Sequence, residues 1–129
     1  MAAGVGMDLI EVARIERALD RHPRLADRLF TEDELKYAAS KGRPGRHLAA
    51  RFAAKEAVVK ALGLGPGTIL REIEVVAGDE GDPAPTIRLS GRVKDQAESR
   101  GLEVQVSLTH AREMAGAVAI ADPAAEERN

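Results

Sequence analysis

The stretch RFAAKEAVVKALG, residues 51–63, combines the pattern of a buried helix with four charged side chains. Ala, Val and Leu fill most of its positions, and Gly63 follows the last of them, as is typical of a helix end. We therefore expect a long helix from about His47 to Leu62. The charges need an explanation, because ionised side chains are rarely buried without a partner. They are Arg51, Lys55, Glu56 and Lys60.

On a helical wheel at about 100° per residue, these charges form two pairs, each about 40° apart. Glu56 and Lys60 have the i,i+4 spacing of an ordinary ion pair on a solvated helix face. Arg51 and Lys55 repel each other at that spacing unless an anion, such as a phosphate, lies between them. Glu56 could instead join Asp8 in binding magnesium, which commonly takes one or two carboxylates plus phosphate oxygens and water. From spacing alone, the simpler interpretation of Asp8 is a helix cap.

Composition limits the class of protein. The 129 residues fit a single domain, 1–129, with a polar tail from about residue 122 that we expect to be flexible. The absence of Cys excludes disulfides, thiolate metal sites and a Cys nucleophile. A net charge of −2 and only 2% aromatic residues argue against nucleic-acid binding. No apolar run reaches the length of a membrane span, so we expect a soluble cytoplasmic protein without membrane or nucleic-acid partners.

The remaining pattern predicts an α+β fold. Gly4 and Gly6 lie in an expected strand at 3–9 and suggest close backbone approach there. A T-x-x-E capping box at Thr31 predicts the start of another helix. Because helices come first and strands later, we expect an antiparallel sheet packed against the long central helix. The other expected elements are helices at 9–22, 32–40 and 92–100, and strands at 72–76, 86–89, 102–109 and 115–121.

Four blocks of sequence occur in a fixed order along the chain. Together they resemble the holo-acyl-carrier-protein synthases, the small bacterial 4′-phosphopantetheinyl transferases. The resemblance implies that family's fold and its reaction in fatty acid biosynthesis: transfer of 4′-phosphopantetheine from coenzyme A to a serine of apo-acyl carrier protein, with adenosine 3′,5′-bisphosphate as the other product. It also implies a homotrimer with active sites between subunits. The blocks are GVGMDLIEVARIER (4–17), FTEDEL (30–35), RFAAKEAVVKALG (51–63) and VSLTHAREMAGAVAI (106–120).

The resemblance also implies roles for individual residues. Asp8 and Glu56 would hold Mg²⁺ against the pyrophosphate, and Lys60 would stabilise or protonate the leaving group. Glu56, directly or through a metal-bound water, is a candidate base for the serine hydroxyl. The basic loop at 41–46 is as well explained by a solvated turn, and the glycines first of all end the helix. The residues expected to contact coenzyme A are Arg51, Lys55, Lys41, Arg43, Arg46, Thr109, His110, Gly63 and Gly65.

A cationic face on the first expected helix is a further candidate site. Such a face is often merely solvated, but the resemblance implies that acyl carrier proteins, which are strongly acidic, dock on it. Related proteins often place larger apolar residues beside these arginines than the Ala18 and Leu25 of this chain. The face comprises Arg14, Arg17 and Arg21, which lie within about 60° on the wheel, followed by Arg24.

Three classes of function can be separated by these residues. A magnesium-dependent transferase needs Asp8, Glu56 and Lys60 together. A non-catalytic module that binds coenzyme A or a carrier protein would not need the complete set. A nucleic-acid-binding domain using the arginine face is disfavoured by net charge and by the scarcity of aromatic residues. We therefore expect a holo-acyl-carrier-protein synthase.

Overall fold

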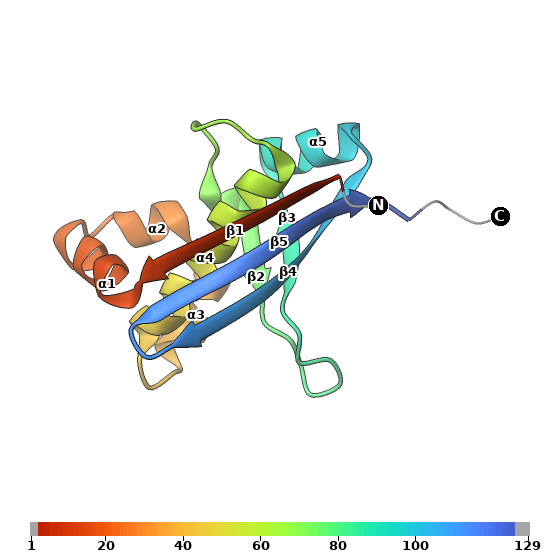
Figure 1. The fold of residues 1–129 in the computed structure, drawn as a ribbon. Helices are drawn as coiled ribbons and strands as arrows, with labels where there is room; N and C mark the ends of the chain where they lie inside the picture. The colour runs from red at the N-terminus through yellow and green to blue at the C-terminus, as the bar shows by residue number, and fades with distance from the viewer. Residues whose placement is uncertain (1–2, 126–129) are drawn as a thin grey trace.

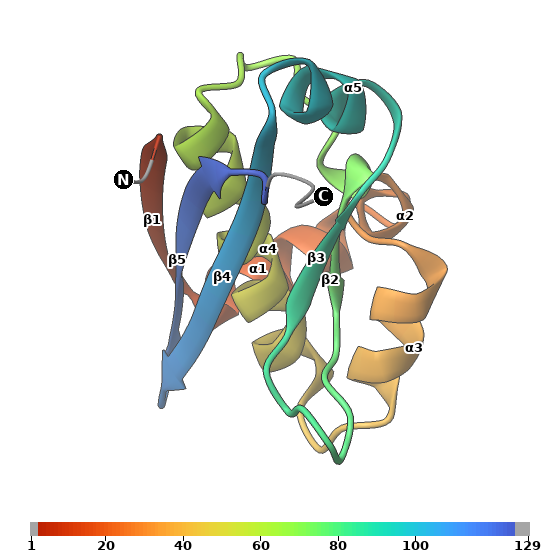
Figure 2. The ribbon, with the colours of Figure 1, turned by 90° about the vertical axis from the view of Figure 1, so that its right-hand side faces the viewer.

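The computed structural model describes residues 3–125. The long helix α4 (Pro44–Leu62) lies between two antiparallel sheets, as Figures 1 and 2 show from two sides. The expected α+β fold with a long helix packed on antiparallel strands is confirmed. One sheet has the order β1-β5-β4 and the other pairs β2 with β3. The strands are β1 (Gly4–Glu11), β2 (Ile73–Val76), β3 (Thr86–Leu89), β4 (Leu102–Ala111) and β5 (Met114–Pro123).

Within the described part of the chain, four further helices and one turn of 3-10 helix surround this arrangement. In Figure 1, α1 and α2 lie beside one end of the three-stranded sheet, and α5 lies near the other. Figure 2 shows α3 on the far side of the β2–β3 hairpin from that sheet. The elements are α1 (Val12–Arg21), α2 (Leu25–Leu29), α3 (Glu32–Ala39), α5 (Gly91–Ser99) and the 3-10 helix η1 (Leu70–Glu72).

Small side chains allow α4 to lie directly on the three-stranded sheet. A methyl group at Gly6 would collide with the carbonyl oxygen of Ala57, and one at Gly4 with that of Ala61. The close backbone approach predicted at these two glycines is therefore confirmed. The interface also buries alanines of α4 and β5, so the core needs few aromatic side chains. These alanines are Ala49, Ala50, Ala53, Ala54, Ala57, Ala61, Ala115, Ala117, Ala119 and Ala121.

Two local signals have the structure that the sequence predicted. The side-chain oxygen of Thr31 accepts from the backbone N–H of Glu34, and Glu34 accepts from the N–H of Thr31, which completes the capping box. Gly63 ends α4 with a φ of 64°, a left-handed conformation that glycine adopts at little cost.

The structure corrects the prediction at the first strand–helix junction. β1 continues to Glu11, so Asp8 is an interior strand residue and not a helix cap. The reason is tertiary: pairing with β5 continues from Gly4↔Ala121 to Glu11↔Met114 and overrides the helical spacing that begins at Leu9. Asp8 thereby turns its side chain toward the same side as the buried Gly6 and Ile10, the side that packs on α4.

Three other boundaries differ from the expectation. The five-residue helix α2 was not expected, because one turn is too short to show periodicity. α4 begins at Pro44, where proline suits the first turn, so the last residues of the basic loop are helical. β5 extends to Pro123, past the start of the expected flexible tail, whereas residues 126–129 lie outside the described residues. Over residues 3–125, no helix is long and apolar enough to cross a membrane.

Candidate active site

Asp8 and Glu56 approach each other from β1 and α4. Both line one surface hollow of about 460 Å³. Burial raises the pKa of the Glu56 carboxyl above its ordinary value, the negative charge of Asp8 raises it further, and Lys60 opposes both effects. Two carboxylates in a partly desolvated hollow favour a proton or a metal cation between them. The structure thus brings together the two predicted magnesium ligands.

Lys60 pairs with Asp8. Its Nζ donates to the carbonyl oxygen of Met7 at 2.8 Å and lies 3.4 Å from Asp8 Oδ1. Glu56 takes part in no ion pair within 4.0 Å among residues 3–125, so the simple i,i+4 pair of Glu56 with Lys60 is wrong. The side chain of Lys60 remains 53% exposed, which leaves its ammonium group accessible to a ligand.

The wall of this hollow combines one cation with apolar side chains. Arg14 lines it from α1, so the cationic helix face reaches the same hollow as the two carboxylates. The hollow can therefore offer charge to an anionic ligand and apolar contact to an aliphatic one. The main apolar side chains in its wall are Ile15, Ala18, Leu25, Leu29 and Phe52.

A second hollow, of about 300 Å³, collects another group of predicted residues. Arg51 of α4 lines it together with Thr109 and His110 near the end of β4. Arg51 is 5% exposed, and its guanidinium carbon lies 4.2 Å from the ring centroid of Tyr37. Its Nε has no hydrogen-bond partner in the part of the chain that the structure describes. A buried, unpaired donor beside this hollow is suited to an anionic ligand.

Sequence reasoning missed two residues of this second hollow. Tyr37 lies under the guanidinium of Arg51, and His47 lies one helical turn before Arg51 on α4. The i,i+4 spacing of His47 and Arg51 was the available signal, since such residues share a helix face. Tyr37 gave no such signal, because it comes from a different helix.

Among residues 3–125, the two hollows share no lining residue. One protomer therefore does not bring Arg51, Thr109 and His110 into the pocket of Asp8 and Glu56. Gly65 lines a third hollow, beside α5, and Gly63 is an exposed helix-end residue. The predicted contacts of Gly63 and Gly65 with coenzyme A therefore remain predictions.

Lys55 requires a correction. Its side chain is fully buried, and Nζ donates to Glu34 Oε1 at 2.8 Å and to the carbonyl oxygens of Leu70 at 3.1 Å and Ile73 at 2.5 Å. These three bonds use all three ammonium donors. Burial lowers the pKa of Lys55, and the charge of Glu34 opposes that shift. Lys55 therefore holds the core together and is not available to a phosphate of coenzyme A.

The basic loop contributes less than expected. Arg43 forms bidentate contacts with Glu16 at 2.9–3.1 Å and with Glu113 at 2.8–3.0 Å, which raises its pKa and lowers the pKa of both carboxyls. The structure therefore corrects the expectation for Arg43, whose donors already join α1 to the β4–β5 turn. Arg46 lies in the first turn of α4, and its buried Nε has no partner among the described residues. Lys41 remains exposed, with Nζ 4.6 Å from the ring centroid of Tyr37.

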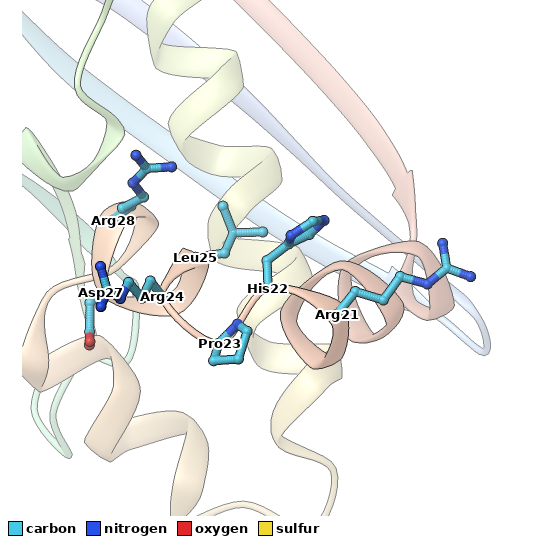
Figure 3. A pocket seen from close by; sticks show the side chains of 7 residues that line it. All are labelled: Arg21, His22, Pro23, Arg24, Leu25, Asp27 and Arg28. Atoms are coloured by element: carbon cyan, nitrogen blue, oxygen red, sulfur yellow. The ribbon is translucent and has the colours of Figure 1, made fainter.

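The predicted docking arginines are all exposed, and none pairs with a carboxylate within residues 3–125. A hollow of about 960 Å³ lies at the α1–α2 connection. Figure 3 shows Arg21 on α1, apart from Arg24 and Arg28 on the α2 side; Arg28 is a cation that was not predicted. Of the described residues that line this hollow, only Asp27 carries a carboxylate, so its chemistry suits the docking of an anionic surface better than metal binding.

Known proteins with similar sequences and structures cover nearly the whole chain. The family model of the 4′-phosphopantetheinyl transferase superfamily matches residues 4–119. The holo-[acyl-carrier-protein] synthase of Moorella thermoacetica is 44% identical over 124 residues, 95% of each chain. The Neisseria meningitidis synthase structure has a TM-score of 0.84 at 29% identity, covering 95% of this chain and 99% of that chain. The Bacillus anthracis synthase in complex with CoA (3′,5′-ADP) has a TM-score of 0.77 at 34% identity, covering 96% and 99%.

Proposed function

Because the chain belongs to the 4′-phosphopantetheinyl transferase superfamily, we infer that it transfers 4′-phosphopantetheine from coenzyme A to a serine of apo-acyl carrier protein. Adenosine 3′,5′-bisphosphate is the other product. Relatives named as holo-[acyl-carrier-protein] synthases, and one solved with CoA, support both the reaction and the substrate. The observation that carries the inference is the grouping of Asp8, Glu56 and Lys60 at the junction of β1 and α4. A module that only binds coenzyme A would not need these three residues together.

The proposal includes a magnesium ion held by Asp8 and Glu56. The donor set fits, because two carboxylates share one hollow and the pKa of Glu56 is raised by burial and by Asp8. Residues 3–125 contain no group of three or more potential metal ligands, so water and pyrophosphate oxygens would complete the coordination. A bound Mg²⁺ would supply positive charge against the pyrophosphate.

In this proposal, Glu56 takes the proton from the serine and Lys60 stabilises the leaving group. The serine oxygen of the carrier forms a bond to the β-phosphorus of coenzyme A, while the bond from that phosphorus to the bridging oxygen breaks. Glu56 would accept the serine proton, because burial and the charge of Asp8 raise the pKa of its carboxyl and so strengthen it as a base. Lys60, oriented by Met7 and Asp8, would donate a hydrogen bond to the departing phosphate oxygen.

Carrier-protein docking on α1 would deliver the serine to this hollow. Arg14 belongs both to the exposed cationic face and to the wall beside Asp8 and Glu56. An acidic carrier held by Arg14, Arg17, Arg21 and Arg24 would therefore contact the rim of the reaction site. Ala18 and Leu25 line the same hollow and provide a small apolar contact.

A homotrimer with sites between subunits is also part of the proposal. The sheet face opposite α4 exposes three large apolar side chains of β1, each about two-thirds exposed: Val5 67%, Met7 68% and Leu9 66%. Val118 and Ile120 of β5 continue this face, which we call the apolar sheet face. Patches of this kind mark protein contacts. Subunit contact at the apolar sheet face would also explain why two hollows with related chemistry are separate in one protomer.

Light scattering tests the assembly. The wild-type chain should have the mass of three protomers, and Met7→Asp should reduce that mass, because a carboxylate would be buried without a partner. Glu103→Asp, a conservative change at an exposed residue of β4, is the matched control. A wild-type protein that remains monomeric at micromolar concentration would contradict this part of the proposal.

The reaction is tested by product analysis. With coenzyme A, apo-acyl carrier protein and Mg²⁺, the chain should release adenosine 3′,5′-bisphosphate, which chromatography separates from coenzyme A. Asp8→Asn should abolish the release. Binding of coenzyme A without any bisphosphate release would instead indicate a non-catalytic binding module.

A further inference from the structure

The hollow of Arg51 contains a histidine to which neither the motifs nor the reaction gives a role. We propose that His47 takes up a proton when the 3′-phosphate of coenzyme A binds beside Arg51, so that recognition of this phosphate depends on pH. The inference rests on the proposed function, because it takes coenzyme A as the ligand of the hollow. It adds a specificity-determining residue and a proton to that binding step.

The position of His47 makes contact with a bound phosphate feasible. Its ring lies edge-on to two other rings of the hollow, with centroids 5.9 Å from Tyr37 and 6.4 Å from His110. Arg51 follows one turn later on α4 and lines the same hollow. The Nε of Arg51 is buried and unpaired within the described chain, so a donor is already in place for an anionic oxygen.

The charges around His47 are mainly positive. Burial lowers its pKa below the ordinary value of 6.5, and Arg51, His110, Lys41 and Arg46 lower it further, in that order. Tyr37 adds an aromatic ring from α3. The carboxylate that lines the hollow belongs to Asp79, whose Oδ1 accepts from the N–H groups of Gly81 and Asp82 at 2.9 and 2.8 Å. The unliganded hollow thus disfavours the protonated form of His47.

A phosphate monoester bound in the hollow would add negative charge beside His47 and so raise the pKa of its imidazole. It carries a charge of about −1.5 to −2 at neutral pH, and opposite charge nearby favours the protonated imidazole. The pKa of His47 must therefore be higher in the complex than in the free protein. Affinity is then greatest below the pKa of the free protein, decreases by up to about tenfold per pH unit between the two pKa values, and levels off above the pKa of the complex.

The 3′-phosphate is the part of coenzyme A that this hollow would bind. The proposed magnesium site places the pyrophosphate at Asp8 and Glu56, and their hollow shares no residue with that of Arg51. The remaining phosphate of coenzyme A is the 3′-monoester on the ribose. A phosphate monoester also titrates near pH 6, so the histidine itself must be observed and not the overall proton balance.

NMR can observe His47 directly, because the chain has only three histidines. The imidazole Cε1–H signals of the full-length protein can be assigned with the single variants His22→Gln, His47→Gln and His110→Gln. Each signal is then titrated with pH alone, with adenosine 3′,5′-bisphosphate, and with adenosine 5′-monophosphate. We expect the bisphosphate to raise the pKa of His47 by about 1–3 units, whereas the 5′-monophosphate leaves it nearly unchanged. His22, exposed at the α1–α2 connection, is the internal control.

Bisphosphate affinity gives a second measurement. In the wild type it should decrease as pH rises, and His47→Gln should remove most of that dependence, whereas the matched His22→Gln should retain it. An unchanged pKa of His47 at saturating bisphosphate, or a shift confined to His110, would overturn the inference. Either result leaves the proposed function intact if transfer to the carrier protein is still observed. If only the proposed function were wrong, the chain would bind the bisphosphate with the expected rise in the pKa of His47 but would transfer no 4′-phosphopantetheine to the carrier protein.

Discussion

Replacing Lys55 by Met should destabilise the fold by about 3–4 kcal/mol, because it leaves a buried carboxylate without its cation. The pair of Lys55 and Glu34 is fully buried, and the ammonium group also holds the carbonyl oxygens of Leu70 and Ile73. Breaking a buried pair from one side costs about 3–5 kcal/mol. We expect the lower part of this range because Glu34 still accepts from two backbone N–H groups, and Met fills most of the space.

Urea unfolding at a fixed protomer concentration measures this cost, since association would otherwise change the apparent stability. The double variant Lys55→Met with Glu34→Gln should recover part of the loss, because no unpaired charge remains buried. The affinity of folded Lys55→Met for coenzyme A should be close to that of the wild type. A stability loss below about 1 kcal/mol, the range of an exposed ion pair, combined with weaker coenzyme A binding would refute the structural role and restore Lys55 as a phosphate ligand.

Three further predictions concern the reaction site and the docking face. Glu56→Gln should keep the fold but abolish transfer, because the near-isosteric amide lacks the charge that binds a hard cation; near-normal turnover at ordinary magnesium concentration would exclude Glu56 as a metal ligand. Without metal, the raised pKa of Glu56 means that its contribution to stability is fully present below its ordinary pKa of 4.5 and is lost as pH rises through the folded-state value. Thermal scans in chelator should therefore show Glu56→Gln melting above the wild type at pH 8, with the difference vanishing in acid, and a wild type that melts higher at pH 8 would contradict this. Arg14→Glu with Arg21→Glu should raise the KM for carrier protein several-fold and weaken its salt dependence, with coenzyme A binding nearly unchanged; tight carrier binding by this variant in low salt would show that the arginine face is only solvated.

The sequence predicted those parts of the fold that depend on local signals. The α4 helix, the capping box at Thr31 and the helix end at Gly63 each follow from neighbouring residues. The length of β1 could not be predicted in this way, because pairing with β5, far away in the chain, overrides a helical pattern that begins at Leu9. The approach of Asp8 to Glu56 likewise depends on tertiary packing; the charge pattern offered the pair only as an alternative to a helix cap, and the resemblance to a family was the stronger argument for it.

The error at Lys55 has a simple physical origin. The wheel showed correctly that two neighbouring cations, Arg51 and Lys55, need an anion. For Lys55 that anion is the carboxylate of Glu34 on α3, which pairs with it directly. Burial lowers the pKa of Arg51, and the charges of Tyr37 and Glu34 only oppose that shift. A helical wheel contains no information about the facing helix, so an external phosphate was the available explanation. His47 was missed although its i,i+4 spacing to Arg51 was visible in the sequence, because its ring neighbours Tyr37 and His110 come from other elements.

Mass spectrometry of the carrier protein tests the assigned activity most directly. Apo-acyl carrier protein is incubated with coenzyme A, Mg²⁺ and the wild-type chain, in parallel with a carrier whose acceptor serine is replaced by alanine. The wild-type carrier should gain the mass of one 4′-phosphopantetheine group, and neither the alanine carrier nor a reaction containing Glu56→Gln should gain it. A wild-type carrier whose mass remains unchanged, although the chain is folded and binds coenzyme A, would contradict the assignment of this protein as a phosphopantetheinyl transferase.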